Sequence, residues 1–126
     1  MIPTFVKSYE ASADVSAYRI AKFSDAAASR KVALATAATD PMIGVIDKMA
    51  GLTGEMVDVH LAGLASVELG GTVTAGAPLT SDATGRAIVA TVAVATNKRV
   101  IGVAHEPGVV GDIIDVWLAP APLYAV

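Results

Sequence analysis

The sequence predicts an all-β fold, either a small barrel or a sandwich built from two similar half-units. Three observations carry this prediction: an internal repeat, segments in which apolar residues alternate with polar ones, and glycine-containing turns between those segments. At 126 residues the chain has the size of one domain, large enough to form a core without metals or disulfides. A single core is therefore expected.

The internal repeat relates residues 43–62 to residues 101–119, with one gap opposite Ala50. Nine of the nineteen aligned pairs are identical, and several of the others exchange one apolar residue for another. A weaker match extends backwards and aligns Val32-Ala33-Leu34 with Ile88-Val89-Ala90. The repeat predicts one β domain over residues 14–120, with units at about 14–63 and 72–120. Residues 1–13 then form an extended N-terminal arm, and residues 121–126 form a C-terminal tail.

The segments 57–61 and 114–118 alternate with a period of two, which is typical of half-buried strands. Their aliphatic residues share one face, and the opposite face carries Asp58, His60, Asp115 and Trp117. Shorter apolar segments between the glycine turns follow the same alternation and predict further strands. Residues 25–38 contain good helix formers, but Gly85 at the matching place of the second unit favours a hairpin turn in both units.

Composition excludes several classes of function. The formal net charge of −3 and the pI near 5.2 lack the positive surface that nucleic acids require, so no nucleic-acid partner is expected. The longest uncharged aliphatic stretch, residues 87–96, is too short to cross a bilayer as a helix, and Glu10 and Asp14 interrupt any signal-peptide core. The sequence therefore predicts a soluble protein without a membrane partner. Charged residues make up only 17%, which favours a surface partly covered by another protein.

The sequence contains no recognisable motif for catalysis, metal binding or cofactor binding. There is no cysteine, and neither His60 nor His105 has a second histidine or a carboxylate at ligand spacing. Asp58 and Asp115 are equivalent by the repeat, but the alternation favours solvated strand residues over an acid-base pair. Neither a phosphate-binding glycine loop nor a Gly-x-Ser-x-Gly turn occurs. We therefore expect no enzymatic activity, no cofactor and no metal.

The segment Asp47-Lys48-Met49 leaves a second class of function open. Barrels with two similar halves include the lipoyl and biotinyl carrier domains, whose modified lysine lies at the tip of a hairpin. The segment Gly51-Leu52-Thr53-Gly54 that follows here departs from the carrier pattern. The alternative to a structural protein is therefore a barrel-type module that binds a small ligand or carries a prosthetic group on Lys48.

The order of several segments resembles the small head decoration proteins, or capsid cement proteins, of tailed bacteriophages. The most specific segment is GGTVTAGAPLTSDATGRA at residues 70–87; Ala77 departs from it, because an acidic residue is expected after Ala-Gly. The other matching segments are residues 15–19, 43–45, 57–63, 101–104 and 111–116. The resemblance implies a β-rich protein on the outer capsid surface of the virion, made in the host cytoplasm. It also implies that the protein binds the major capsid protein and stabilises the shell.

Two groups of residues are candidates for contacts with the capsid or with other copies of the chain, as a homotrimer or alternatively a dimer. The first is the apolar N-terminal arm, with Ile2, Phe5, Val6 and Tyr9, which we expect to add a strand to a neighbouring subunit. Its alternative is pairing within its own barrel. The second is Trp117 with Ile113, which alternation places on the outer face. Its alternative is that the chain end covers Trp117.

Overall fold

The chain folds into nine β-strands over the residues that the computed structural model describes, which are 2–25, 27, 30–91 and 97–124. Side chains are described for residues 5–25, 27, 30–91 and 98–120. No helix occurs in these ranges, and the predicted all-β class is confirmed. The strands are β1 (Ile2–Ala11), β2 (Ile20–Phe23), β3 (Lys31–Leu34), β4 (Met42–Ile46), β5 (Met56–Glu68), β6 (Pro78–Ser81), β7 (Ala87–Val89), β8 (Asn97–Ala104) and β9 (Ile113–Tyr124).

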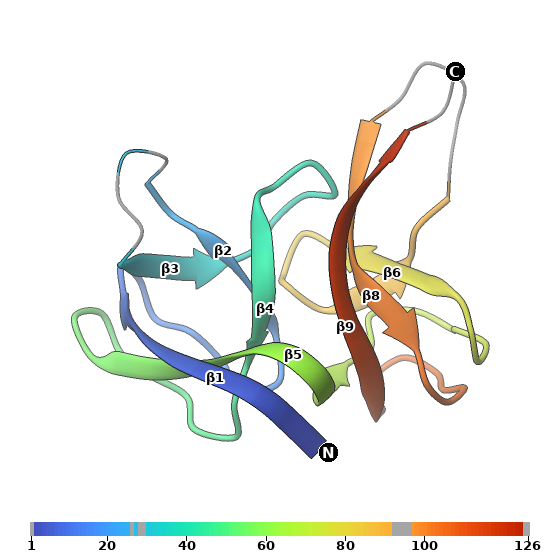
Figure 1. Cartoon of the computed structure of the whole chain (residues 1–126), viewed down its shortest axis with the longest axis horizontal. Coiled ribbons are helices and arrows are strands. Elements are labelled where there is room, and N and C mark those ends of the chain that lie inside the picture. Colours follow the sequence, from blue (N-terminus) through green and yellow to red (C-terminus); the bar gives the residue numbers. More distant parts are fainter. Residues whose placement is uncertain (1, 26, 28–29, 92–96, 125–126) are drawn as a thin grey trace.

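Five of the strands close a small barrel, and the others extend from it (Figure 1). The sheet order runs β1-β3-β2-β4-β5, and β1 closes the circle because it pairs in parallel with β3 and antiparallel with β5. The remaining order is β9-β8-β6-β7, and it begins where β9 pairs with the second part of β5. Closure leaves no free edge in the first half, which removes a common site of aggregation.

The second half repeats the strand pairing of the first. The hairpin β2–β3 corresponds to β6–β7, and the pairs β2–β4 and β4–β5 correspond to β6–β8 and β8–β9. Loop hydrogen bonds repeat as well: Val15 N–H donates to Gly51 O at 2.8 Å, and Val73 N–H donates to Gly108 O at 2.9 Å. The two units predicted from the sequence therefore share one architecture. The hairpin turn predicted after β2 is also present.

The N-terminal segment is part of this architecture, contrary to the prediction of an extended arm over residues 1–13. Strand β1 pairs with β5 of its own chain from Ile2 to Glu10. Its counterpart in the second half is the end of β5 itself, where Leu69 bridges to Ala87 in parallel just as Ala11 pairs with Val32. This equivalence was hidden in the sequence because one strand, β5, serves both halves.

The structure also corrects two boundaries. Val32 corresponds to Ala87 and not to Ile88, because the loop at residues 24–30 is longer than its counterpart at 82–86. At the other end, β9 continues to Tyr124, where it pairs with β8. Residues 121–124 are therefore strand and not a tail, and residues 125–126 of the predicted tail lie outside the described part of the chain.

The core consists of two clusters of buried side chains. The smaller one fills the first barrel and includes Tyr9, Val32, Ile46 and Val59. The larger one fills the second half, but four of its members come from the first half: Ile20, Ala35, Met42 and Val45. Strand β4 therefore packs inwards on one side and against β8 and β9 on the other (Figure 1).

Candidate interaction surface

Trp117 lies in an apolar row of four residues on four strands, of which three are exposed and one, Leu64, is half-buried. Its backbone pairs with Val103 on β8 and with Leu64 on β5, and Val103 pairs with Pro78 on β6. We call these four residues the Trp117 face. As the alternation predicts, Trp117 points outwards: 62% of it is exposed, and Val103 is 36% exposed. The backbone of residues 121–124 does not fold back over Trp117 but continues β9 along β8.

The exposed part of β1 adjoins the Trp117 face through β5. Phe5 pairs with Ala62, two residues before Leu64, and both Phe5 and Val6 are exposed. Register shifts on both sides of Phe5 allow these consecutive side chains to reach solvent together. For Ile2, the structure describes only the backbone, which pairs with Leu64. The predicted interface residues Ile2, Phe5 and Val6 thus have backbone positions beside the Trp117 face.

Tyr9 does not belong to this surface, contrary to the prediction. It is buried in the first barrel, where its ring meets Phe23 edge-to-face at a centroid distance of 6.3 Å. Lys7 Nζ lies 5.3 Å from the Tyr9 ring centroid. The reason is the pairing of β1 with β5, which turns Tyr9 inwards towards the core. Tyr9 therefore stabilises the fold of its own subunit.

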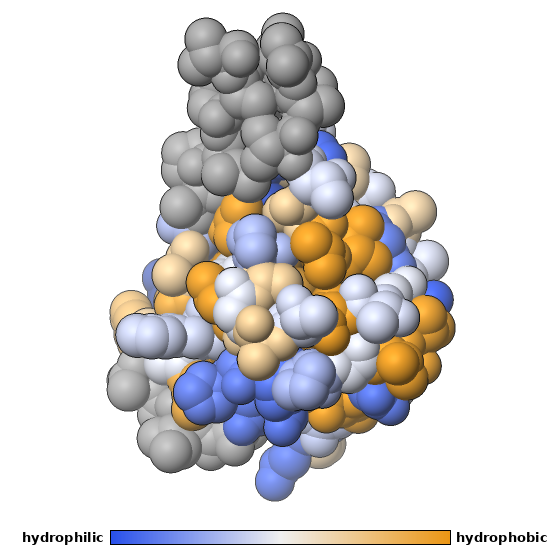
Figure 2. All heavy atoms as spheres, turned by 90° about the vertical axis from the view of Figure 1, so that its right-hand side faces the viewer, coloured by the Kyte–Doolittle hydropathy of each residue, from blue (hydrophilic) through white to orange (hydrophobic). Residues whose placement is uncertain are grey.

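Ile113, the first residue of β9, belongs to a second apolar feature together with Val109 and Val110 of the preceding β8–β9 loop, and all three are exposed. At the repeat-equivalent place, Leu52 of the β4–β5 loop and Met56, the first residue of β5, are also exposed. We call these two places the apolar loop tips. Sequence reasoning singled out Ile113 but missed the tips as a pair, although the repeat aligns Leu52 with Val109. Figure 2 looks onto the second half and shows orange apolar residues reaching its surface between blue polar ones.

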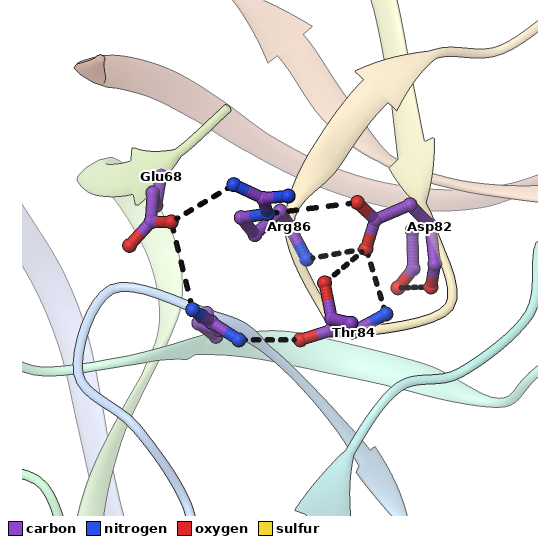
Figure 3. Close-up of polar contacts among 6 residues, drawn as sticks. Glu68, Asp82, Thr84 and Arg86 are labelled. Atoms are coloured by element: carbon purple, nitrogen blue, oxygen red, sulfur yellow. Dashed lines mark hydrogen bonds and ion pairs between the residues drawn. The ribbon is translucent and has the colours of Figure 1, made fainter. Parts of the chain in front are cut away.

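A network of ion pairs and hydrogen bonds joins the two halves (Figure 3). Glu68 Oε2 lies 3.5 Å from Arg19 Nη2 in the first half and 3.5 Å from Arg86 Nη1 in the second. Asp82 Oδ1 accepts hydrogen bonds from the backbone N–H groups of Thr84 and Arg86, at 2.8 and 2.9 Å. Arg19 also donates to the Thr84 carbonyl at 3.1 Å. The segment around residues 81–87, part of the most specific match to decoration proteins, therefore acts as a structural turn that fixes the two halves together.

No catalytic or metal role is predicted for either histidine, and one of the two, His60, is buried. His60 is only 2% exposed, and its Nε2 lies 2.9 Å from Asp47 Oδ1. Burial acts to raise the pKa of the Asp47 carboxyl, but hydrogen bonds from the His60 side chain and the Lys48 backbone, with the charges of both residues, lower it below its usual value. The alternation predicted an outward His60; its strand face is as predicted, but other parts of the chain cover it. The other histidine, His105, is exposed.

The remaining candidates for chemistry are Asp58 and Asp115, which the repeat makes equivalent. Asp58 is exposed and accepts a hydrogen bond from Ser8 Oγ at 2.7 Å. Within the described residues, no three His, Cys, Asp or Glu side chains gather as metal ligands would. The described part of the chain also has no helix of the length and apolarity needed to cross a membrane. The features that stand out on the surface are therefore apolar ones suited to protein contacts.

Comparison with known proteins gives a structural neighbour. No protein-family model and no curated protein matches the sequence. Among solved structures, the N base of the head fiber protein gp8.5 of bacteriophage phi29 is similar, with a TM-score of 0.68 and 21% sequence identity. The similarity covers 91% of this chain and 93% of that one. The chain therefore has the fold of a head-associated phage protein over nearly its whole length, in agreement with its sequence resemblance to phage head decoration proteins.

Proposed function

We propose that this protein is a non-enzymatic decoration protein that binds the major capsid protein on the outer surface of a phage head and stabilises the shell. The observation that carries the proposal is the fold similarity to the base of a phage head fiber, which covers nine-tenths of both chains. The residue-level resemblance to decoration proteins supports it independently. The protein would be made in the host cytoplasm and act on the virion.

The apolar loop tips are the best candidates for the capsid contact. They present Leu52 and Met56 from one half and Val109 and Ile113 from the other, so the same kind of surface is offered twice. Large apolar side chains at exposed loop ends are unfavourable in water and are typical of sites that a partner covers.

Binding to purified heads tests the proposal. Heads that lack the protein should take it up to a fixed number of copies, and loaded heads should resist heat or low ionic strength better than bare ones. The variant Leu52→Asp with Val109→Asp should lose uptake. Thr39→Asp should retain it, because Thr39 is exposed in the β3–β4 loop, at the other end of β4 from the tip. Absence of uptake by the unmodified protein at any concentration would refute the function.

The carrier alternative is tested by the mass of the intact purified protein. Lys48 is exposed in the β4–β5 loop, and a lipoyl or biotinyl group on it would add mass. We expect the mass to equal that of the unmodified chain after expression in cells that contain the modifying enzymes. An added prosthetic group, removed by Lys48→Arg, would favour the carrier function instead.

A further inference from the structure

The two halves of the chain pack head-to-tail, so that one face of the first half is covered by the second. In the first half a row of backbone-paired residues runs from Ile20 through Val45 to His60. Ile20 and Val45 are fully buried because they belong to the core cluster of the second half. The partners in that cluster include Ile101 and Leu118. An outer face of one half thus completes the core of the other.

The equivalent row of the second half consists of Pro78, Val103 and Trp117 of the Trp117 face, which the described part of the chain leaves exposed. Pro78 corresponds to Ile20, Val103 to Val45, and Trp117 to His60. The exposed fraction rises from 0% for Val45 to 36% for Val103. For the third pair it rises from 2% to 62%. The chain therefore carries a second, uncovered copy of the face that it uses to join its own halves.

The first half also carries the equivalent of the surface on which its own face packs in the second half. This equivalent surface is only partly buried. Ile43 and Leu61 are the first-half equivalents of Ile101 and Leu118, which are buried. Unlike these counterparts, Ile43 and Leu61 are only partly buried, although they pack against the core of the first barrel. Phe23 and Leu34 are partly buried beside them. The first half thus lacks the covering that it gives to the second half.

We propose that a second copy of this chain supplies that covering, with the Trp117 face of one subunit seated on Ile43 and Leu61 of the next. The two surfaces fit because each is the repeat-equivalent of a surface already in contact inside the chain. The contact is heterologous, so repeating it covers every such face in a closed ring when the rotation between copies closes on itself, and gives an open filament when it does not. The inference concerns contacts between copies and goes beyond the proposed binding to the capsid.

The proposed contact between copies lacks polar interactions that border the contact between the two halves of one chain. Ile20 N–H donates to Gly85 O at 2.8 Å, and Arg19 pairs with Glu68. The equivalent positions carry Pro78, which has no N–H, and Ala77, which has no charge. Apolar contacts therefore dominate the proposed interface, and Trp117 is its largest side chain. Tryptophan is enriched among the residues that contribute most to binding at protein interfaces.

Cross-linking of single-cysteine variants tests the pairing directly, because the chain has no cysteine of its own. Val103→Cys and Ile43→Cys lie on the two proposed surfaces. A mixture of the two variants, treated with a short bismaleimide, should give a covalent dimer that contains one chain of each. Each variant alone should give none. Dimers of Val103→Cys with itself, or no cross-linked product in the mixture, would overturn the head-to-tail arrangement.

Mixing experiments give a second test that does not need cross-linking. Trp117→Glu and Ile43→Lys should each weaken self-association by more than tenfold, as measured by sedimentation velocity. Mixed together they should form a heterodimer and nothing larger, because only one intact interface remains between them. Val110→Glu, in an apolar loop tip, is the matched control and should associate as the unmodified protein does. A mixture that stays monomeric contradicts the proposal.

A replacement variant and a measurement on the unmodified protein keep the test independent of folding defects and of the capsid. If Ile43→Lys fails to unfold cooperatively on heating, Leu34→Lys replaces it on the same surface. An unmodified protein that remains monomeric up to millimolar concentration would also refute the contact. Because no capsid is present in these assays, their failure leaves the proposed binding to heads standing, and failure of head binding leaves the contact between copies standing.

Discussion

Tyr18 and Gly76 occupy equivalent places in the two halves, and both have positive φ angles, 61° and 87°. Tyr18 N–H donates to Ile46 O at 3.1 Å, and Gly76 N–H donates to Ala104 O at 2.8 Å. The left-handed conformation is therefore a requirement of the repeat at this place. It is uncommon for a residue with a side chain, and Tyr18 is the one such residue in the described part of the chain.

Gly76→Ala should destabilise the protein by about 1 kcal/mol, because a Cβ disfavours the left-handed conformation. The space around Gly76 is open, so no steric clash adds to this effect. Gly71→Ala is the matched control, since its Cβ would meet only Ile88 at an ordinary 3.6 Å and its φ is not left-handed. Urea unfolding should show the first variant less stable and the second unchanged or slightly more stable. Equal effects would contradict the assignment.

Glu68→Gln should destabilise the protein by about 1–2 kcal/mol, because two arginines then lose the carboxylate between them. The side chains of Glu68 and Arg19 are each 24% exposed, so water replaces the lost contact only in part. The repeat provides a control: Glu10 pairs with Lys31 at 3.6 Å where both side chains are more exposed. Glu10→Gln should therefore change the free energy of unfolding by at most about 0.5 kcal/mol. The comparison is made by urea titration at low and high salt.

Acid should destabilise the protein through Asp40. Burial acts to raise the pKa of the Asp40 carboxyl, but the Thr36 backbone hydrogen bond and the side chain and charge of Lys22 lower it below its ordinary value of 3.8. A lowered folded pKa means that the unfolded chain binds the proton more readily. The stabilisation is therefore complete above pH 3.8 and is lost as the pH falls through the folded value.

Asp40→Asn removes this titration and should flatten the dependence of unfolding free energy on pH below about 4. It should also lower stability at neutral pH, because the ion pair between Lys22 Nζ and Asp40 Oδ2 at 3.3 Å is lost. Thermal unfolding followed from pH 2 to 7 measures both effects. A variant whose pH profile runs parallel to that of the unmodified protein would show that Asp40 contributes nothing to acid sensitivity.

Trp117 reports on assembly because it is the only tryptophan in the chain. In dissociated protein its fluorescence should be quenched strongly by iodide, since most of the side chain is exposed. In assembled protein the emission should shift to shorter wavelength and the quenching should fall, because the proposed contact removes water from the indole. Trp117→Phe with Val103→Trp moves the probe to the neighbouring strand and should respond in the same way. Emission that is independent of protein concentration would contradict burial in the contact.

The sequence predicted the fold where the physical signal was local. Alternation in residues 114–118 was enough to place Trp117 outside and Val116 inside. The same alternation in residues 57–61 placed His60 outside, yet His60 is buried, because coverage of a strand face depends on packing between distant segments. Tyr9 was missed for a related reason, since its place in the core follows from pairing with β5. No alternation of apolar and polar residues within the first thirteen residues indicates the pairing with β5.

The thirteen-residue strand β5 belongs to both halves, with its beginning in one barrel and its end paired to β9. Neither half can lose this strand and keep its own hydrogen-bonded neighbours, so the halves are expected to unfold together in one cooperative transition. The sharing also imposes an order on folding during synthesis. The first barrel has all five of its strands once β5 has left the ribosome, and its closed surface then serves as the template on which β9 assembles the second half.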